Sequence, residues 1–364
     1  MRVGMICPYS LTVHGGVQNQ VLGLARALRA QGVDTRVLGP CDGPPPDAGV
    51  TPLGASIPTA ANGSVAPIAP DPAAQLRIIR ALRDEAFDLL HIHEPMAPGP
   101  TMTATVLKQA PIVATFHRAG SSRSYQYLSK GVRWLQKRIE VSVAVSEEAA
   151  AVAREQLGGE CEILFNGVET DRYAATARTP ADRKTIFFVG RHEPRKGLSV
   201  LLDAMQWLPP DVRLVIASDG PETGALELQT AGDPRIEWVG PIGEVDKIRR
   251  MREADAFCAP SLHGESFGIV LLEAMAASTP VVASNIPGYA NVARHGLDAL
   301  LPEPGDPEAL ASALARALER GPEIETMIES GLARADEFSM RRLADRYLTL
   351  YEKALGADPA AVLA

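Results

Sequence analysis

The densest group of residues able to do chemistry lies between Gly264 and Met275. Glu265 belongs to the loop before a predicted helix, and Glu273 follows eight residues later on that helix. Amides at the start of a helix are free and carry a partial positive charge, so they attract phosphate. Glu265 is placed to accept hydrogen bonds from sugar hydroxyls, and Glu273 could hold a ribose. The segment therefore predicts a site for a phosphorylated sugar.

Two cations accompany these carboxylates. Arg191 ends a predicted strand, and Lys196 comes five residues later, just before a predicted helix. Arginine offers a bidentate fork and lysine a compact charge, so the two together suit a diphosphate. A surface ion pair is the alternative for these two residues by themselves. Paired carboxylates also serve glycoside hydrolases, but a hydrolase needs neither the cations nor the helix start.

Two further features follow predicted strands. Gly15 and Gly16 stand directly before a predicted helix, where glycine allows close approach of the backbone to a ligand. The loop lacks the dinucleotide-binding glycine spacing, so a tight turn is the alternative. His117 follows the predicted strand 112–116. Ligands bind beyond the carboxyl ends of strands in parallel sheets, which favours a role for His117.

The elements that must position these residues form two series. Apolar runs alternate with helix-period segments, which predicts parallel sheets, and 364 residues suit two domains. The predicted strands are 2–6, 35–38, 89–92, 112–116 and 141–145, then 185–189, 213–217, 236–239, 256–259 and 281–283. The polar stretch 166–178 suits a linker. We therefore expect an α/β protein with two Rossmann-like, doubly wound domains, 1–168 and 169–339, that face a cleft.

Two segments stand outside this alternation. Residues 40–72 are rich in Pro, Gly and Ala and predict a long irregular loop with short strands. No strand follows the last predicted helix, 340–356. We expect this helix to pack back on the first domain.

Composition narrows the function. Hydrophobic residues are 46% and charged residues 22%, which excludes global disorder. The net charge of −8 gives no basic footprint for nucleic acid. No cysteine pair has zinc or redox spacing and no Asp-x-Asp motif occurs, so no metal or cofactor is required, although a divalent cation remains possible.

The sequence also indicates where in the cell the protein is located. No apolar run reaches about 18 residues, so no transmembrane helix is expected, and the first residues lack the layout of a signal peptide. With the cysteine pattern, these features indicate a cytoplasmic protein. Residues 95–139 hold seven basic residues and no acidic one, which suits an anionic ligand or membrane surface, or else solvated helix faces.

Together these residues resemble the retaining glycosyltransferases of the GT-B fold, and within them the actinobacterial phosphatidylinositol α-mannosyltransferases. Glu265 and Glu273 match the Glu-x7-Glu element, and Arg191 and Lys196 match the Arg/Lys pair. The other matching stretches begin at Met5, Gly15, Asn62, Leu90, Ile112, Asp219 and Gly264. The resemblance implies transfer of mannose from GDP-mannose to the inositol ring of phosphatidylinositol, with retention of configuration.

The resemblance also implies roles for individual residues. His117, which would orient the reacting sugar, is implied to be catalytic with Arg191, Lys196 and Glu265. The implied donor-binding residues are Gly16, Arg191, Lys196, Ile242, Lys247, Glu265, Phe267, Gly268, Ile269 and Glu273. Ile242 and Lys247 would lie beside the guanine. The acceptor residues that match are Tyr9, Gln18, Asn62 and Ser64, and we expect Arg118 and Arg123 to supply a further anion site.

The helix at 76–83 carries three arginines and would contact an anionic membrane, which implies attachment to the inner face of the cell membrane. An ordinary surface helix is the alternative. For the activity, three alternatives remain open. The chain could use another sugar nucleotide or another acceptor, lipid or soluble. It could be an epimerase or hydrolase that consumes a donor without an acceptor. It could also be a sugar-nucleotide-binding module without catalysis.

Overall fold

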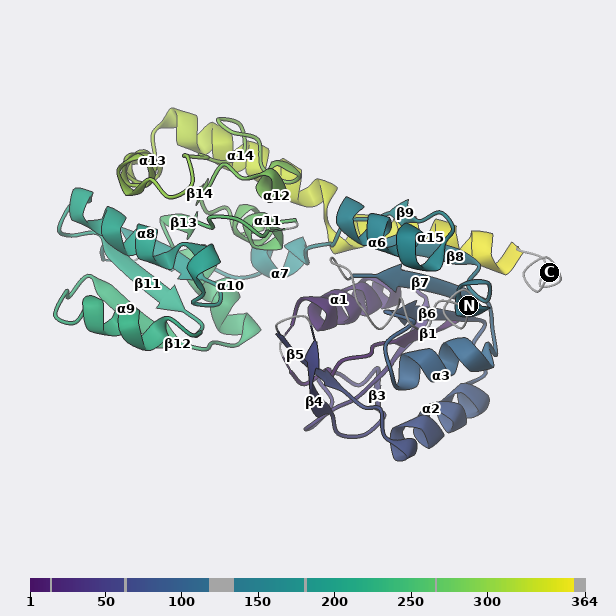
Figure 1. Cartoon of the computed structure of the whole chain (residues 1–364). Helices are drawn as coiled ribbons and strands as arrows, with labels where there is room; N and C mark the ends of the chain where they lie inside the picture. Colours follow the sequence, from purple (N-terminus) through teal and green to yellow (C-terminus); the bar gives the residue numbers. More distant parts are fainter. Residues whose placement is uncertain (14, 62–63, 118–133, 180–181, 266, 357–364) are drawn as a thin grey trace. The chain divides into compact units, whose positions relative to one another are not determined.

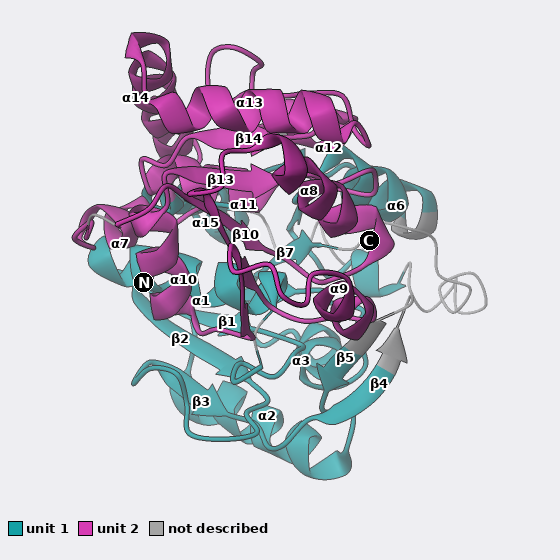
Figure 2. Ribbon diagram, turned by 90° about the vertical axis from the view of Figure 1, so that its left-hand side faces the viewer, with its two compact units in different colours: residues 1–167, 340–364 teal, residues 168–339 magenta. Residues whose placement is uncertain are grey.

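The computed structural model describes residues 1–13, 15–61, 64–117, 134–179, 182–265 and 267–356. The chain divides into two compact units (Figure 2). Unit 1 contains Met1–Gly167 together with the C-terminal residues from Met340, and unit 2 contains Val168–Ser339. Each unit has its own sheet and its own core.

Unit 1 is built on a seven-stranded parallel sheet in the order β3-β2-β1-β6-β7-β8-β9 (Figure 1). The strands are β1 (Arg2–Ile6), β2 (Asp34–Gly39), β3 (Val50–Pro52), β6 (Leu89–His93), β7 (Ile112–Phe116), β8 (Val141–Ala144) and β9 (Glu162–Ile163). Every residue of β6 and β7 is buried, as expected for central strands that are covered on both faces. The predicted parallel α/β organisation is therefore confirmed for this unit.

Helices cover both faces of this sheet. They are α1 (Gly16–Ala30), α2 (Pro72–Glu85), α3 (Pro100–Leu107), α6 (Glu147–Leu157) and α15 (Met340–Gly356). One core cluster joins α1 and α15 to β1, and another joins α2 and α3 to β6 and β7. The apolar residues of α15 recur at helical spacing, so the helix buries Tyr347 and Tyr351 on a single face. The C-terminal segment is thus part of the core of unit 1.

Residues 40–72 contain short strands, as expected. β3 joins the main sheet, and β4 (Ile57–Ala61) pairs antiparallel with β5 (Ser64–Ile68) as a separate ribbon. Ser10 donates its amide hydrogen to the Pro67 carbonyl at 2.9 Å. This bond fastens the ribbon beside the end of β1.

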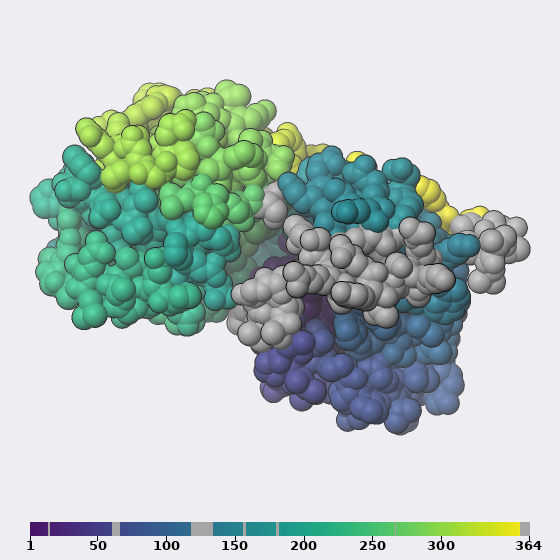
Figure 3. Space-filling view, in the orientation of Figure 1, coloured from purple at the N-terminus to yellow at the C-terminus, as the bar shows by residue number. Residues whose placement is uncertain are grey.

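Unit 2 is built on a five-stranded parallel sheet in the order β12-β11-β10-β13-β14. Its strands are β10 (Thr185–Val189), β11 (Arg213–Ala217), β12 (Ile236–Gly240), β13 (Ala256–Ala259) and β14 (Val281–Ala283). Its helices are α7 (Thr170–Ala174), α8 (Leu198–Ala204), α9 (Thr223–Gln229), α10 (Glu244–Glu253), α11 (Ile269–Ala276), α12 (Pro287–Ala290), α13 (Pro307–Glu319) and α14 (Pro322–Glu337). Two short 3-10 turns are η1 (Pro194–Lys196) and η2 (Met205–Trp207). The surface of α13 and α14 is the yellow-green part of this unit in Figure 3.

The boundary between the two units lies between Gly167 and Val168, within the polar stretch 166–178 that was expected to be a linker. The rest of this stretch is more ordered than expected, because it contains α7, which packs against α10 and α11. The anchor of α7 is Tyr173, which is only 2% exposed. Because α7 buries only one aromatic residue among polar neighbours, its sequence lacks the repeated apolar spacing that indicates a helix.

Candidate active site

The carboxyl edge of the unit 2 sheet brings Lys196 and Glu265 together. Lys196 follows β10, and Glu265 follows the neighbouring strand β13. The Nζ of Lys196 lies 2.5 Å from Oε1 of Glu265, and both side chains are largely buried. The hydroxyl of Ser261 donates to the same carboxylate oxygen at 3.2 Å. The carboxylate is thus held in one position.

A glycine makes this approach of the two loops possible. Gly197, directly after Lys196, has a φ of +66°. A Cβ built there would lie 2.0 Å from the carbonyl oxygen of Pro260, in the loop that leads to Glu265. Only glycine fits both this backbone conformation and this close contact.

A row of alternating charges connects Lys196 to Arg191. The Nε of Arg191 lies 2.9 Å from one oxygen of Glu193, and the Nε of Arg195 lies 2.8 Å from the other. Arg195 then reaches Glu265 at 3.3 Å. Three cations and two carboxylates leave one positive charge in excess. Arg191 is the most exposed member, at 58%, so its guanidinium is accessible to an anionic ligand.

The start of α11 lies beside this row. Gly268 is the N-cap of α11 with a φ of +83°, and a Cβ there would lie 2.7 Å from a ring carbon of Tyr289. The cap provides no side-chain hydrogen bond, and the first turn carries no acidic residue. The Leu271 amide donates to the Gly268 carbonyl at 2.9 Å, so the first amides of the turn, those of Ile269 and Val270, are the ones able to bind an anion. Phe267 is buried and packs edge-on against Phe338, with ring centroids 5.5 Å apart.

A second ion cluster lies farther along α11. Lys247 on α10 contacts Glu273 at 2.8 Å and Glu244 at 3.1 Å. Burial raises the pKa of Glu273, and the charge of Lys247 opposes this rise. Burial lowers the pKa of Lys247, but the two carboxylates outweigh burial and the pKa is raised. Ile242 is half-buried in the loop between β12 and α10.

In unit 1, His117 follows β7 and is held by β6 and the residue after it. The Nε2 of His117 lies 2.8 Å from the Nδ1 of His93. The backbone N–H of His117 donates to the Glu94 carboxylate at 2.6 Å. Burial lowers the pKa of His117 to about 4 and that of His93 well below its usual range, so both rings are neutral at pH 7.

The other predicted residues of unit 1 gather near the ends of β1 and β5. Tyr9 forms an isolated antiparallel bridge with Ile68. Gln18 on α1 is buried and donates to the Ser10 carbonyl at 3.4 Å. Gly16 is the first residue of α1. Asn62, Arg118 and Arg123 lie outside the described residues, as does the side chain of Ser64.

Sequence reasoning missed several partners of the predicted residues: Glu193, Arg195, Ser261, Tyr289, Glu94 and His93. Arg195 stands next to Lys196, so the adjacent charge was a signal that could have found it. Nothing in the sequence indicated that His93 would contact His117, because only the pairing of β6 with β7 brings the two rings together.

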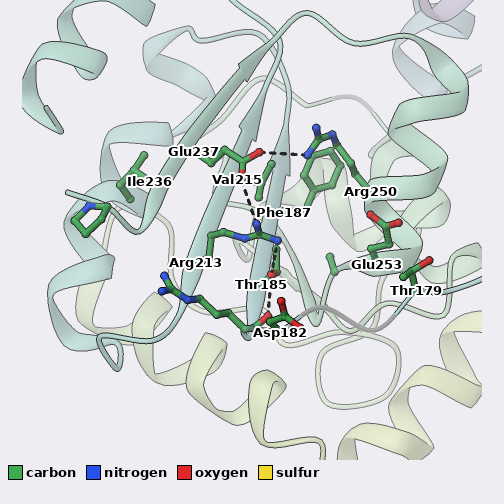
Figure 4. A pocket seen from close by; sticks show the side chains of 13 residues that line it. Thr179, Asp182, Thr185, Phe187, Arg213, Val215, Ile236, Glu237, Arg250 and Glu253 are labelled. Carbon is green, nitrogen blue, oxygen red and sulfur yellow. Dashed lines mark hydrogen bonds and ion pairs between the residues drawn. The ribbon is translucent and has the colours of Figure 1, made fainter. Parts of the chain in front are cut away.

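A cavity of about 650 Å³ lies elsewhere in unit 2 (Figure 4). Thr185, Arg213 and Ile236, the first residues of β10, β11 and β12, line it. Because these strands are parallel, the cavity lies at their amino ends, whereas Lys196 lies at the carboxyl edge of the sheet. Arg213 and Arg250 both pair with Glu237 there, at 3.2 and 3.7 Å.

No group of three or more His, Cys, Asp or Glu side chains among the described residues could hold a metal ion. None of the helices in the described part of the chain is both long and apolar enough to span a membrane.

Comparison with known proteins identifies the chain as a glycosyltransferase. Residues 14–172 match the model of Glycosyltransferase Family 4, and residues 169–334 match that of Glycosyl transferases group 1. The phosphatidyl-myo-inositol mannosyltransferase of Mycobacterium leprae (strain TN) is 40% identical over 97% of this chain and 96% of that protein. The enzyme of the same name from Mycobacterium tuberculosis (strain ATCC 25618 / H37Rv) is 38% identical over 98% of each.

Solved structures agree on the fold. A glycosyltransferase from Rickettsia africae ESF-5 has a TM-score of 0.73 at 17% identity, over 98% of this chain and 99% of that chain. A sucrose-phosphate synthase from Thermosynechococcus elongatus has a TM-score of 0.71 at 20% identity, over 98% of this chain and 100% of that chain. These similarities confirm the predicted GT-B architecture. From its relatives at 38 to 40% identity, the chain belongs to the phosphatidyl-myo-inositol mannosyltransferase family of GT-B glycosyltransferases.

Proposed function

We propose that the protein transfers mannose from GDP-mannose to the inositol ring of phosphatidylinositol, with retention of configuration. The names of its relatives support the mannosyl group and the acceptor. The donor half of the proposal rests on one observation, the row of charges from Arg191 through Glu265 to Lys196. Such a row has an excess positive charge and cations that can change partners when an anion binds.

The leaving group of the reaction would be GDP. Negative charge grows on its outer phosphate as the bond to mannose breaks. Arg191, Lys196 and the amides at the start of α11 stabilise this charge. Each preorganised contact of this type supplies about 3 kcal/mol of transition-state stabilisation. The Gly16 amide remains a predicted further contact to the diphosphate.

Glu265 and Glu273 would bind the two sugars of the donor. Glu265 accepts hydrogen bonds from mannose hydroxyls, and Ser261 keeps that carboxylate in place. Glu273 accepts from the ribose, with its charge maintained by Lys247. Ile242 and Lys247 lie on the loop and helix that would border the guanine. The proposed reaction requires no metal or organic cofactor.

The acceptor would bind unit 1. Tyr9 and Gln18 lie near the ribbon of β4 and β5, and Asn62, Ser64, Arg118 and Arg123 are proposed to complete the acceptor site. His117 would orient the reacting sugar. In this mechanism the leaving phosphate accepts the proton of the attacking inositol hydroxyl.

We propose that α2 attaches the protein to the inner face of the membrane. Leu76, Ile79, Arg80 and Arg83 form one exposed face of this helix, which we call the α2 face. Apolar residues flanked by cations suit an anionic lipid surface. Arg77 lies at the flank of this face and donates to the Leu53 carbonyl at 3.2 Å, so it fastens α2 to unit 1.

The test is a matrix of radiolabelled donors and acceptors. The proposal expects labelled lipid only when GDP-mannose and phosphatidylinositol vesicles are both present. Analysis of the product by NMR should show an α-mannosyl linkage. Transfer from UDP-glucose in place of GDP-mannose would contradict the donor. Release of GDP at the same rate without lipid would identify a hydrolase.

A further inference from the structure

His117 is held from two sides by consecutive residues. In the pairing of β6 with β7, His93 is the partner of Thr115, two residues before His117. The side chain of His93 meets that of His117 at 2.8 Å, and the carboxylate of Glu94 accepts the backbone N–H of His117. Glu94 adopts a φ of +51°, which is rare for a residue with a side chain. This arrangement fixes both the backbone and the ring of His117.

The contact between the two rings requires one proton. Both imidazoles are neutral, because burial lowers the pKa of each. A neutral imidazole has one N–H and one bare nitrogen. One ring must therefore donate to the other, and the choice decides which nitrogen of His117 carries its proton.

The surroundings of the other ring nitrogen of His93, Nε2, indicate which of the two rings donates the proton. This nitrogen is buried and has no hydrogen-bond partner among the described residues. If His93 accepted from His117, its own proton would be on Nε2, as a buried N–H without an acceptor. Such orphaned donors are rarer in proteins than under-satisfied acceptors. The favoured arrangement places the His93 proton on Nδ1, from which it donates to the Nε2 of His117.

We propose that His93 is a positioning residue that holds His117 as the Nδ1–H tautomer. His117 then offers a hydrogen-bond donor at Nδ1, and an oxygen of the reacting sugar is the matching ligand. This second step rests on the proposed function. His117 is partly exposed whereas His93 is only 2% exposed, so His93 acts through His117 and touches no substrate.

His91, two residues before His93, provides a matched control. Its Nδ1 lies 2.7 Å from the hydroxyl of Tyr351, and its Nε2 lies 2.7 Å from the hydroxyl of Thr115. Both nitrogens therefore have partners, and neither contacts His117. His91 also stacks on the His93 ring, with ring centroids 4.3 Å apart. A substitution at His91 therefore perturbs the same strand, the same core and the packing of His93, but it removes neither partner of the hydrogen bond between His93 and His117.

The direct test is nitrogen NMR of the ligand-free protein labelled with 15N-histidine, with His117→Gln used to assign the resonances. The proposal expects a protonated Nδ1 and a bare Nε2 for His117 at pH 7. This preference should be lost in His93→Leu and retained in His91→Asn. A protonated Nε2 of His117 in the unmodified protein would overturn the proposal. This readout needs no substrate, so its failure is distinct from failure of the proposed function.

Kinetics add a rescue test. In His93→Asn the side-chain amide can donate from near the position of Nδ1. We expect kcat of this variant within about threefold of the unmodified protein, and a loss of about tenfold or more in His93→Leu with little change in KM. The His91→Asn control should keep its kcat per folded molecule. Equal losses in both His93 variants would show a purely structural role and contradict the proposal.

Discussion

Lys196 and Glu265, on the loops after neighbouring strands, form an ion pair of 2.5 Å at the carboxyl edge of the unit 2 sheet. One cation of the proposed diphosphate site is therefore paired with the residue proposed to bind the sugar. A phosphate oxygen must compete with this carboxylate for Lys196. Binding of the nucleotide to Lys196 would thus release the Glu265 carboxylate, which could then accept hydrogen bonds from the mannose.

This competition predicts opposite effects of Glu265→Gln on two ligands. Removal of the carboxylate charge should strengthen binding of GDP by about threefold to tenfold, because Lys196 loses its internal partner. Transfer from GDP-mannose should fall by about a hundredfold, because the sugar loses its acceptor. Calorimetry with GDP and initial rates measure the two effects. Glu237→Gln, at the other end of the strands, is the control and should change neither. Weaker GDP binding in Glu265→Gln would refute the competition.

The proposed contact between Glu273 and the ribose can be isolated with a nucleotide analogue. Glu273→Gln should weaken GDP by roughly tenfold, since hydrogen bonds to charged groups contribute about 1.5 to 3 kcal/mol. For 2′,3′-dideoxy-GDP, the same substitution should have little effect. A binding titration of both ligands to both proteins completes the cycle. Equal losses for the two nucleotides would place Glu273 away from the ribose.

The buried histidines predict an acid-sensitive unit 1. Burial lowers the pKa of His91 to about 3. His91 in the unfolded chain binds a proton below about pH 6.5, while folded His91 stays neutral. The contribution of His91 to stability is therefore constant above that pH and falls as pH decreases. The slope is at most about 1.4 kcal/mol per pH unit for each such histidine.

Urea unfolding of the unmodified protein and of His91→Gln at pH 7.5, 6.5 and 5.5 measures this effect. The substitution should lower stability at pH 7.5, where buried hydrogen bonds are lost. The difference between the two proteins should shrink toward pH 5.5. Parallel pH dependences would show that His91 does not contribute to acid sensitivity.

The α2 face makes a prediction about membranes. Arg80→Ser with Arg83→Ser should reduce cosedimentation with anionic vesicles, because each cation near such a surface contributes about 1 kcal/mol. Arg77→Ser should lower the melting temperature but change vesicle binding less, since Arg77 bonds to the Leu53 carbonyl. Unchanged binding of the double variant would make α2 an ordinary surface helix.

Much of the fold could be predicted from the sequence because central parallel strands are buried on both faces. β10 and β13 therefore appear as largely apolar runs, whatever their neighbours are. The ribbon of β4 and β5 was less visible, because its residues lack a strong apolar alternation. α7, within the predicted linker, was not expected for a related reason: its contribution to the core is the one residue Tyr173.

For the candidate site, individual residues could be predicted from the sequence, but their contacts could not. The spacing of Glu265 and Glu273 indicated one helix and the loop before it, which the structure contains. Their partners could not be predicted, because strand order decides which loops are neighbours. Lys196 meets Glu265 only because β10 lies next to β13, and His93 meets His117 only because β6 lies next to β7.

The central claim is that the donor diphosphate binds the cations after β10. Calorimetric titration of GDP-mannose into Arg191→Ala/Lys196→Ala tests it most directly, beside the control Arg183→Ala/Arg213→Ala at the opposite ends of the strands. The proposal predicts at least a hundredfold weaker binding in the first protein, since two charge-assisted contacts are lost, and unchanged binding in the second. Equal affinity of both double variants for GDP-mannose would contradict the claim.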